Sequence, residues 1–403
     1  MGPTLAPLRV GPFRRLLVSY TVNELGDSVG VVALAILVYD ATQDPLATTL
    51  LFLFAKFLPA FVSPALTAHL DHRALRIVLG CLYLAEASVF VALALLASSF
   101  WLPAVLALAL LDGTLALTGR GLTRGAVAAV LEPHGLLREG NALVNVGFAA
   151  ASVFGAALGG LLVAASGVTA ALLVDALSFV LIATLMATSR GLPAADAATA
   201  GLVARVREGL THAWRHRPAR VLLAGQSVAL VLFTLIVPIE VVYAKETLGA
   251  GDAGYGWLLA SWGSGIVIGS LVYVRVKELP AARLILVSTA LIGLAYCGMA
   301  VAQTILVACA FSIVGGAGNG VQWVAVVTAI QERTPAGLQA RVSGLFESIG
   351  AAMPGIGFVL GGALTELGSP RLAFAVAGVG LLILLVVGWV PARRLAARGD
   401  PIT

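Results

Sequence analysis

Charged side chains inside otherwise apolar segments are the groups in this sequence that could do chemistry. Asn23, Glu24 and Asp27 lie in the apolar stretch from about Leu16 to Tyr39. In a helix these three share one face, because they are three or four residues apart. At 1.5 Å per residue, Asp27 is roughly 17 Å from the start of the stretch, near mid-membrane. An acid there costs a few kcal/mol unless it meets water or a partner. We interpret Asp27, helped by Glu24, as a proton or substrate site; the alternative is a protonated acid that ties two helices together.

Other ionisable residues lie deep in neighbouring apolar segments. Lys56 is at the middle of a segment from Leu46 to Ala68, and it needs a carboxylate or a water-filled cavity. Asp27 or Glu24 is the nearest candidate partner in sequence, and the pair could be functional or purely structural. Further acids within apolar segments are Glu86, Asp112, Asp175 and Glu347, of which we take Asp112 and Glu347 as candidates for proton coupling.

The composition indicates an integral membrane protein. The chain is 60% hydrophobic and 11% charged, with a mean hydropathy of +1.00, and a soluble chain of this size needs far more charge. Its net charge of +5 comes from basic residues in the predicted cytoplasmic loops, with only Lys56, Lys245 and Arg371 elsewhere. This asymmetry sets orientation in the lipid bilayer, so we expect no nucleic-acid partner.

A polar interruption from Arg190 to Arg220 divides the chain. Each flank reads as about six apolar spans of roughly 20 residues, the length that crosses a bilayer. We therefore predict a six-helix bundle over residues 1–189, a cytoplasmic linker over 190–220 and a second six-helix bundle over 221–403. Leu202 to Trp214 has the spacing of an amphipathic surface helix, although a solvated basic linker is the alternative. Met1 to Arg15 lacks the features of a signal peptide, so we expect the first span to stay as a membrane helix with its N-terminus inside. The basic C-terminal tail is likewise expected in the cytoplasm.

The two halves resemble each other. Gly159 and Gly361 lie 202 residues apart, as do Pro133 and Pro335, and a constant offset indicates an internal repeat. Parallel six-helix repeats are typical of transporters that rock two halves around a central site. Stripes of small residues let helices approach closely, and packing alone explains them best; they include Gly155, Gly159, Gly160, Gly357, Gly361 and Gly362.

No sequence motif indicates an enzyme, a metal site or a cofactor. The chain has no GxxxxGK[ST] phosphate loop, so we expect no ATP-driven step. Its five histidines fall in predicted cytoplasmic loops without metal-ligand spacing. The odd number of cysteines, all in apolar segments, argues against a disulfide framework: Cys81, Cys297 and Cys309.

Four stretches carry a family resemblance: ELGDSVGVVALAILVYDAT, LDHRALRIVL, EPHGLLREGNAL and QERTPAGLQARVSGL. With them the whole chain resembles a twelve-span member of the major facilitator superfamily, closest to the bacterial exporters of macrolides and siderophores. The resemblance implies an all-α protein of two pseudo-symmetric six-helix bundles in the bacterial inner (plasma) membrane. It also implies that spans 1, 4, 7 and 10 line the cavity, which favours Asp27 and Asp112 over Glu86 and Asp175.

The resemblance also assigns a cytoplasmic gate and a transport direction. In the loop signature of the superfamily, Asp71 and Arg76 match, whereas Thr67 replaces a glycine and His72 an arginine. The implied latch joins Asp71 to a span-4 arginine and the start of span 11; its basic candidates are Arg73, Arg76, Arg120 and Arg124. The exporter signature of span 5, Gly-Pro-x-x-Gly-Gly, begins at Gly155, with Ala156 in place of the proline.

We therefore predict a monomeric secondary transporter that exports a drug-like, amphiphilic or secondary-metabolite molecule in exchange for protons. An importer, or a lipid or siderophore translocator, on the same fold is the alternative. A central cavity would bind such a substrate with apolar and a few polar side chains; the candidates are Asn23, Asn145, Gln226, Trp257, Trp262, Asn319, Gln322 and Trp323.

Overall fold

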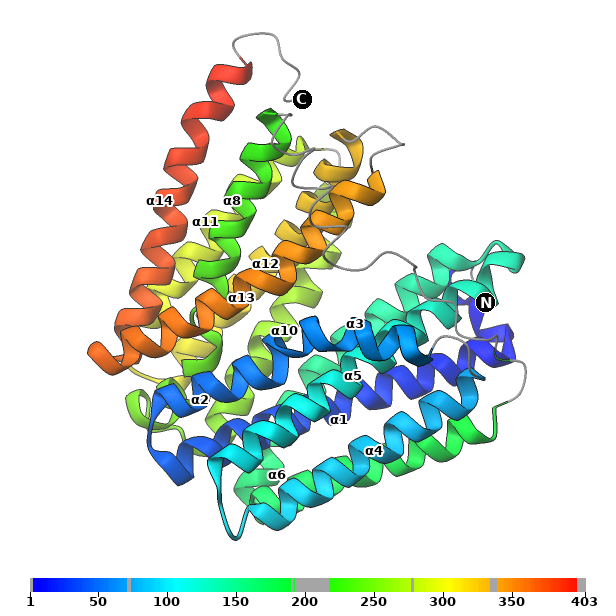
Figure 1. The fold of residues 1–403 in the computed structure, drawn as a ribbon. Helices are drawn as coiled ribbons and strands as arrows, with labels where there is room; N and C mark the ends of the chain where they lie inside the picture. The colour runs from blue at the N-terminus through cyan, green and yellow to red at the C-terminus, as the bar shows by residue number, and fades with distance from the viewer. Residues whose placement is uncertain are drawn as a thin grey trace. The chain divides into compact units, whose positions relative to one another are not determined.

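The computed structural model describes residues 3–70, 74–189, 192, 217–276, 279–333 and 339–396, and every element named in them is a helix. The main helices of the first half come in chain order (Figure 1): α1 (Gly11–Thr42), α2 (Pro45–Phe52), the π-helix η2 (Leu53–Phe57), α3 (Pro59–Leu70), α4 (Leu75–Leu96), α5 (Leu102–Leu131) and α6 (Leu137–Ala187). Those of the second half are α8 (Arg217–Thr234), α9 (Glu240–Val242), α10 (Gly251–Val276), α11 (Ala281–Val301), α12 (Ile305–Arg333), α13 (Gln339–Leu367) and α14 (Pro370–Ala396).

Ten segments of the described residues are long and apolar enough to cross a membrane. One of them, Val146–Ala187, contains Gly167 with non-helical angles (φ 80°, ψ 168°), where α6 divides into two spans. Glycine allows this break because a side chain disfavours positive φ. The apolar part of α13, Ala352–Leu367, is shorter. With the division at Gly167 and this shorter helix, the segments fit the predicted twelve-span plan.

The chain separates into two compact units. One comprises residues 1–43 and 50–199, and the other residues 44–49 and 200–403. In the first unit, α1 packs along α6, and α4 runs beside the second part of α6 (Figure 1). The side chains of α1 are buried along most of its length, so this helix is central to its unit.

Glycines set the close approach of α6 to α1. A Cβ on Gly155 would lie 2.7 Å from the Leu25 carbonyl oxygen, and one on Gly159 would lie 3.1 Å from Val29 Cα. In the second unit, a Cβ on Gly357 would lie 2.6 Å from the Val231 carbonyl oxygen. The stripes thus pack α6 on α1 and α13 on the segment around α8, as small residues do in membranes. The other three stripe glycines are also buried: Gly160, Gly361 and Gly362.

The seventh span is interrupted. After α8 ends at Thr234, the chain passes through the 3-10 helix η4 (Val237–Ile239), the short α9 and the π-helix η5 (Tyr243–Thr247). Pro238 explains the break, since proline cannot donate an amide hydrogen bond and its ring crowds the preceding turn.

Several predicted features lie outside the described residues. These are most of the linker with its amphipathic helix and the gate residues Asp71 and Arg73. The side chains of Asn145 and Glu347 also lie outside the description.

Candidate functional site

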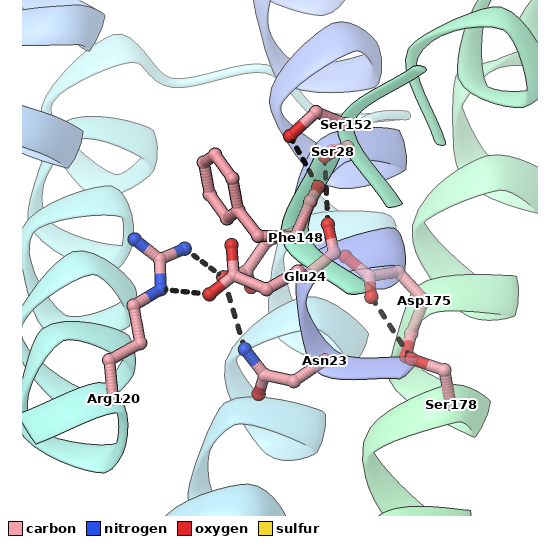
Figure 2. Close-up of polar contacts among 9 residues, drawn as sticks. Asn23, Glu24, Ser28, Arg120, Phe148, Ser152, Asp175 and Ser178 are labelled. Carbon is pink, nitrogen blue, oxygen red and sulfur yellow. Dashed lines mark hydrogen bonds and ion pairs between the residues drawn. The ribbon is translucent and has the colours of Figure 1, made fainter. Parts of the chain in front are cut away.

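The guanidinium of Arg120 binds both acids of α1. Arg120 Nε lies 2.6 Å from Glu24 Oε1, and Arg120 Nη2 lies 2.5 Å from Asp27 Oδ2. Asn23 Nδ2 donates to the same Asp27 oxygen at 3.2 Å. Figure 2 shows Arg120 reaching from α5 toward Glu24 and Asn23 on the facing surface of α1. The shared helical face predicted for the three α1 residues therefore meets one forked cation, which suits two oxygen acceptors at once.

This ion-pair network is shielded from solvent. The side chains of Glu24 and Asp27 are 4% and 7% exposed, whereas that of Arg120 is 25% exposed. One oxygen of Asp27, Oδ1, is buried without a hydrogen-bond partner among the described residues. Since burying an unpaired charge is costly, the opposing charges must lie together here.

The position of Arg120 differs from the sequence expectation. The resemblance assigned Arg120 to a cytoplasmic gate, and sequence proximity suggested Lys56 as the partner of the α1 acids. In the structure Arg120 is the ion-pair partner of Glu24 and Asp27. Arg124, one turn further along α5, and Arg76 at the start of α4 are exposed.

A small cavity beside the ion pairs brings the other predicted ionisable residues together. It has a volume of about 50 Å³, and Asp27, Lys56, Asp112 and Arg120 line it from α1, η2 and α5. All these residues belong to the first unit. A space of this size accommodates a few water molecules rather than a drug. The site is therefore suited to protons and charge exchange, and an amphiphilic substrate needs more space than this.

Lys56 owes its position to a defect in the second span. Pro59 has no amide hydrogen for the carbonyl of Ala55, and its ring would clash with that carbonyl in a regular α-helix. The chain instead widens into η2, where the Leu58 amide donates to the Leu53 carbonyl at 2.9 Å. Single π turns of this kind often occur at functional sites.

Gly113 lets α5 approach this widened turn. A Cβ on Gly113 would lie 2.1 Å from the Ala55 carbonyl oxygen, so only glycine fits without movement. The neighbouring residue Asp112 thereby reaches the same cavity as Lys56. A glycine directly beside a deep acid is the signal in the sequence that indicates this close helix approach.

Two acids that the resemblance set aside are also buried in the first unit. Glu86 on α4 and Asp175 on α6 are each 1% exposed. Figure 2 shows Asp175 beside Ser178, whose hydroxyl lies 3.3 Å from Asp175 Oδ1. Both side chains point into the bundle rather than away from it, so a place on spans 3 and 6 does not remove an acid from the protein interior.

The predicted substrate residues of the second unit lie on three helices, α8, α10 and α12. The ring of Trp262 stacks on that of Tyr296 and packs at a tilt against that of Phe233, with a distance of 5.5 Å between ring centroids in each pair. Gln322 is buried and donates to Thr289 Oγ1 at 2.8 Å, so its amide serves the contact of α12 with α11. The remaining members are half-buried or about half exposed: Gln226, Trp257, Asn319 and Trp323.

The family model of transmembrane secretion effectors (MFS_3) matches residues 2–397. This chain belongs to that family. The family is part of the major facilitator superfamily, whose members are membrane transporters rather than enzymes. The predicted fold and the resemblance to this superfamily are thereby confirmed.

Two curated relatives align with this chain, one over about half of it and the other over most of it. The multidrug efflux pump Tap of Mycobacterium tuberculosis (strain ATCC 25618 / H37Rv) is 30% identical over 236 residues, covering 56% of this chain and 54% of Tap. The chain thus spans about half the length of that relative. The uncharacterized MFS-type transporter YfiS of Bacillus subtilis (strain 168) is 26% identical over 408 residues, covering 93% of this chain and 91% of YfiS.

Solved structures show the same fold at low sequence identity. The nucleoside transporter NupG matches with a TM-score of 0.72 and 12% identity, covering 94% of this chain and 98% of NupG. A D-xylose-proton symporter matches with a TM-score of 0.69 and 13% identity, covering 94% of this chain and 97% of the symporter. At these identities the likeness concerns the fold alone.

Proposed function

We propose that this transporter exports an amphiphilic small molecule in exchange for external protons, and that Asp27 is the main proton-binding group. It would act as a monomer in the plasma membrane with both termini in the cytoplasm. The observation that carries the proposal is the contact of one guanidinium, that of Arg120, with the two carboxyl groups of Glu24 and Asp27.

Charge balance supports a proton at this site. The cavity and its ion pairs gather three acids, Glu24, Asp27 and Asp112, around two bases, Lys56 and Arg120. If all five were ionised, one negative charge would be unbalanced in a medium where charge is costly. Binding of one proton removes the excess, and its release restores it.

A proton on Asp27 would also change the ion pairs of Arg120. A protonated Asp27 attracts the guanidinium less, so Arg120 would be held by Glu24 alone. A ligand that binds one conformation better shifts the conformational equilibrium by that difference in affinity. Proton binding and release would therefore bias the tilt of α1 against α5 and drive alternating access.

Export is the direction that the comparisons favour. The relative Tap is named a multidrug efflux pump, and the span-5 glycines follow the exporter signature apart from Ala156. A small, charge-rich cavity beside α1 would serve a proton equally well in an importer or in a lipid or siderophore translocator. Substrate contacts of Trp257, Trp262 and the other predicted cavity residues belong to the proposal, as do roles for Asn145 and Glu347.

Inverted membrane vesicles test both coupling and direction. With ethidium and erythromycin as probes, an exporter accumulates the probe inside inverted vesicles when protons are pumped inward, and an uncoupler abolishes this accumulation. We expect Asp27→Asn to lose at least 90% of proton-driven accumulation. Glu366→Gln, which alters an exposed acid of α13, is the control. Full proton-driven transport by the Asp27→Asn protein would disprove the assignment.

A further inference from the structure

The acids Glu86 on α4 and Asp175 on α6 are both buried in the first unit. Each side chain is 1% exposed. Both oxygens of Glu86 and one oxygen of Asp175, Oδ2, lack a hydrogen-bond partner among the described residues. The other oxygen of Asp175 lies 3.3 Å from the Ser178 hydroxyl. Neither acid has an ion-pair partner in the part of the chain that the structure describes.

The backbone of α1 is shaped to receive Asp175. A Cβ on Gly26 would lie 2.2 Å from Asp175 Oδ1, and one on Gly30 would lie 2.4 Å from Asp175 Oδ2. Gly26 precedes Asp27 directly and follows Glu24 by two residues. The carboxyl of Asp175 therefore lies against the same turn of α1 whose other face binds Arg120.

Aromatic rings close this region. Phe179 lies one helical turn after Asp175. Its ring centroid is 6.4 Å from that of Tyr83, in a stacked arrangement, and 5.4 Å from that of Phe90. Tyr83 and Phe90 flank Glu86 on α4, one turn before it and one turn after it. The surroundings of the two acids are thus apolar, and an ionised carboxylate without a partner is strongly disfavoured there.

Beyond these apolar neighbours, charged and titratable groups of three helices lie within electrostatic range of the two acids. Asp27 on α1, Asp112 and Arg120 on α5, and Tyr83 on α4 all lie within electrostatic range of Glu86 or Asp175. Arg120 is already engaged by Glu24 and Asp27. Among the described residues no ion pair balances a negative charge at Glu86 or Asp175, and a bound proton would neutralise it.

We propose that Glu86 and Asp175 form a second proton-binding site of this transporter, separated from Asp27 by the backbone of α1. Each carboxylate takes up one proton to become a neutral acid and returns to the carboxylate when the proton leaves. Because Asp175 contacts Gly26, movement of α1 changes the surroundings of both sites together. This inference rests on the proposed proton coupling and extends it to more than one proton in the first unit.

Infrared spectroscopy of the purified, lipid-reconstituted protein tests proton binding without transport. The intensity of the carbonyl band of protonated carboxylic acids should decrease by the equivalent of one carboxyl group in Glu86→Gln and in Asp175→Asn. In the double variant it should decrease by the equivalent of two. Glu366→Gln, on an exposed acid, should leave the band unchanged. An unchanged band in both single variants, with folding verified by thermal melting, would overturn the proposal.

Transport of ethidium in inverted vesicles tests whether these protons take part in coupling. We expect the double variant to lose about tenfold of its proton-driven accumulation while it still exchanges ethidium across the membrane without a proton gradient. Loss of the infrared band with wild-type accumulation would mean that the acids only hold the bundle together, and the coupling role would fall. Failure of the Asp27 assignment is distinguishable, because it is read from the Asp27→Asn protein and leaves the infrared result intact.

Discussion

Arg120 Nη2 lies 2.5 Å from Asp27 Oδ2, although the two residues are 93 positions apart in the chain. Because the same guanidinium also binds Glu24, this contact joins α5 to two acids of α1. A structural pair of one acid and one base would need no proton. One base with two acids leaves a negative charge that a proton can neutralise.

Two replacements of Arg120 should distinguish the contribution of its positive charge from that of its forked hydrogen-bond geometry. Arg120→Gln removes the ion-pair partner of two buried acids, and breaking a buried ion pair costs roughly 3–5 kcal/mol. Arg120→Lys keeps the charge but loses the forked donor geometry. In detergent, we expect the melting temperature to fall strongly for the glutamine variant and less for the lysine variant. Proton-driven transport should be lost in both. A glutamine variant as stable as wild type would contradict the ion-pair assignment.

Gly113 offers a matched test of helix approach on α5. In Gly113→Ala the new Cβ would lie 2.1 Å from the Ala55 carbonyl oxygen, whereas a Cβ on Gly121 of the same helix meets nothing within 4 Å. Overpacking typically costs about 1–3 kcal/mol, and an unhindered glycine-to-alanine change in a helix gains roughly 0.5–1 kcal/mol. The melting temperature should therefore fall for Gly113→Ala and stay the same or rise for Gly121→Ala.

Pro59→Ala should restore a regular helix in the second span. An alanine amide can donate to the Ala55 carbonyl, so the π turn η2 loses its cause. Removal of one extra residue from a turn rotates the preceding residues by about 100°. Lys56 would then leave the cavity, and transport should fall at least tenfold without loss of folding. Cysteine labelling at position 56 would show whether its accessibility changes; an unchanged pattern with normal transport would refute this account.

Lys56 and Asp112 should behave as a coupled pair. Lys56→Met removes a base and Asp112→Asn removes an acid from the same cavity. The first change makes the net charge of the cavity more negative, and the second makes it more positive. The double variant restores the original balance. We expect its proton-driven transport to exceed the product of the two single effects by at least tenfold, as coupled neighbours do in double-mutant cycles. Independent effects of the two changes would show that the cavity does not balance charge as a unit.

The sequence alone determined the membrane class, the spans and the common face of Glu24 and Asp27. These features depend on local hydropathy and on the helical period, which neighbouring residues define. The small-residue stripe at Gly155 and Gly159 was also readable, because close helix approach requires residues of that size.

Only the tertiary structure decided that Arg120, rather than Lys56, binds the acids of α1, and that Glu86 and Asp175 point inward. Lipid-embedded helices are apolar on nearly all faces, so the residue pattern indicates poorly which face turns toward which neighbour. The rotation of each helix and the partner of each charge follow from packing between distant segments. The close approach of α5 to the widened turn η2 likewise joins Pro59 to Gly113, which lie far apart in the sequence.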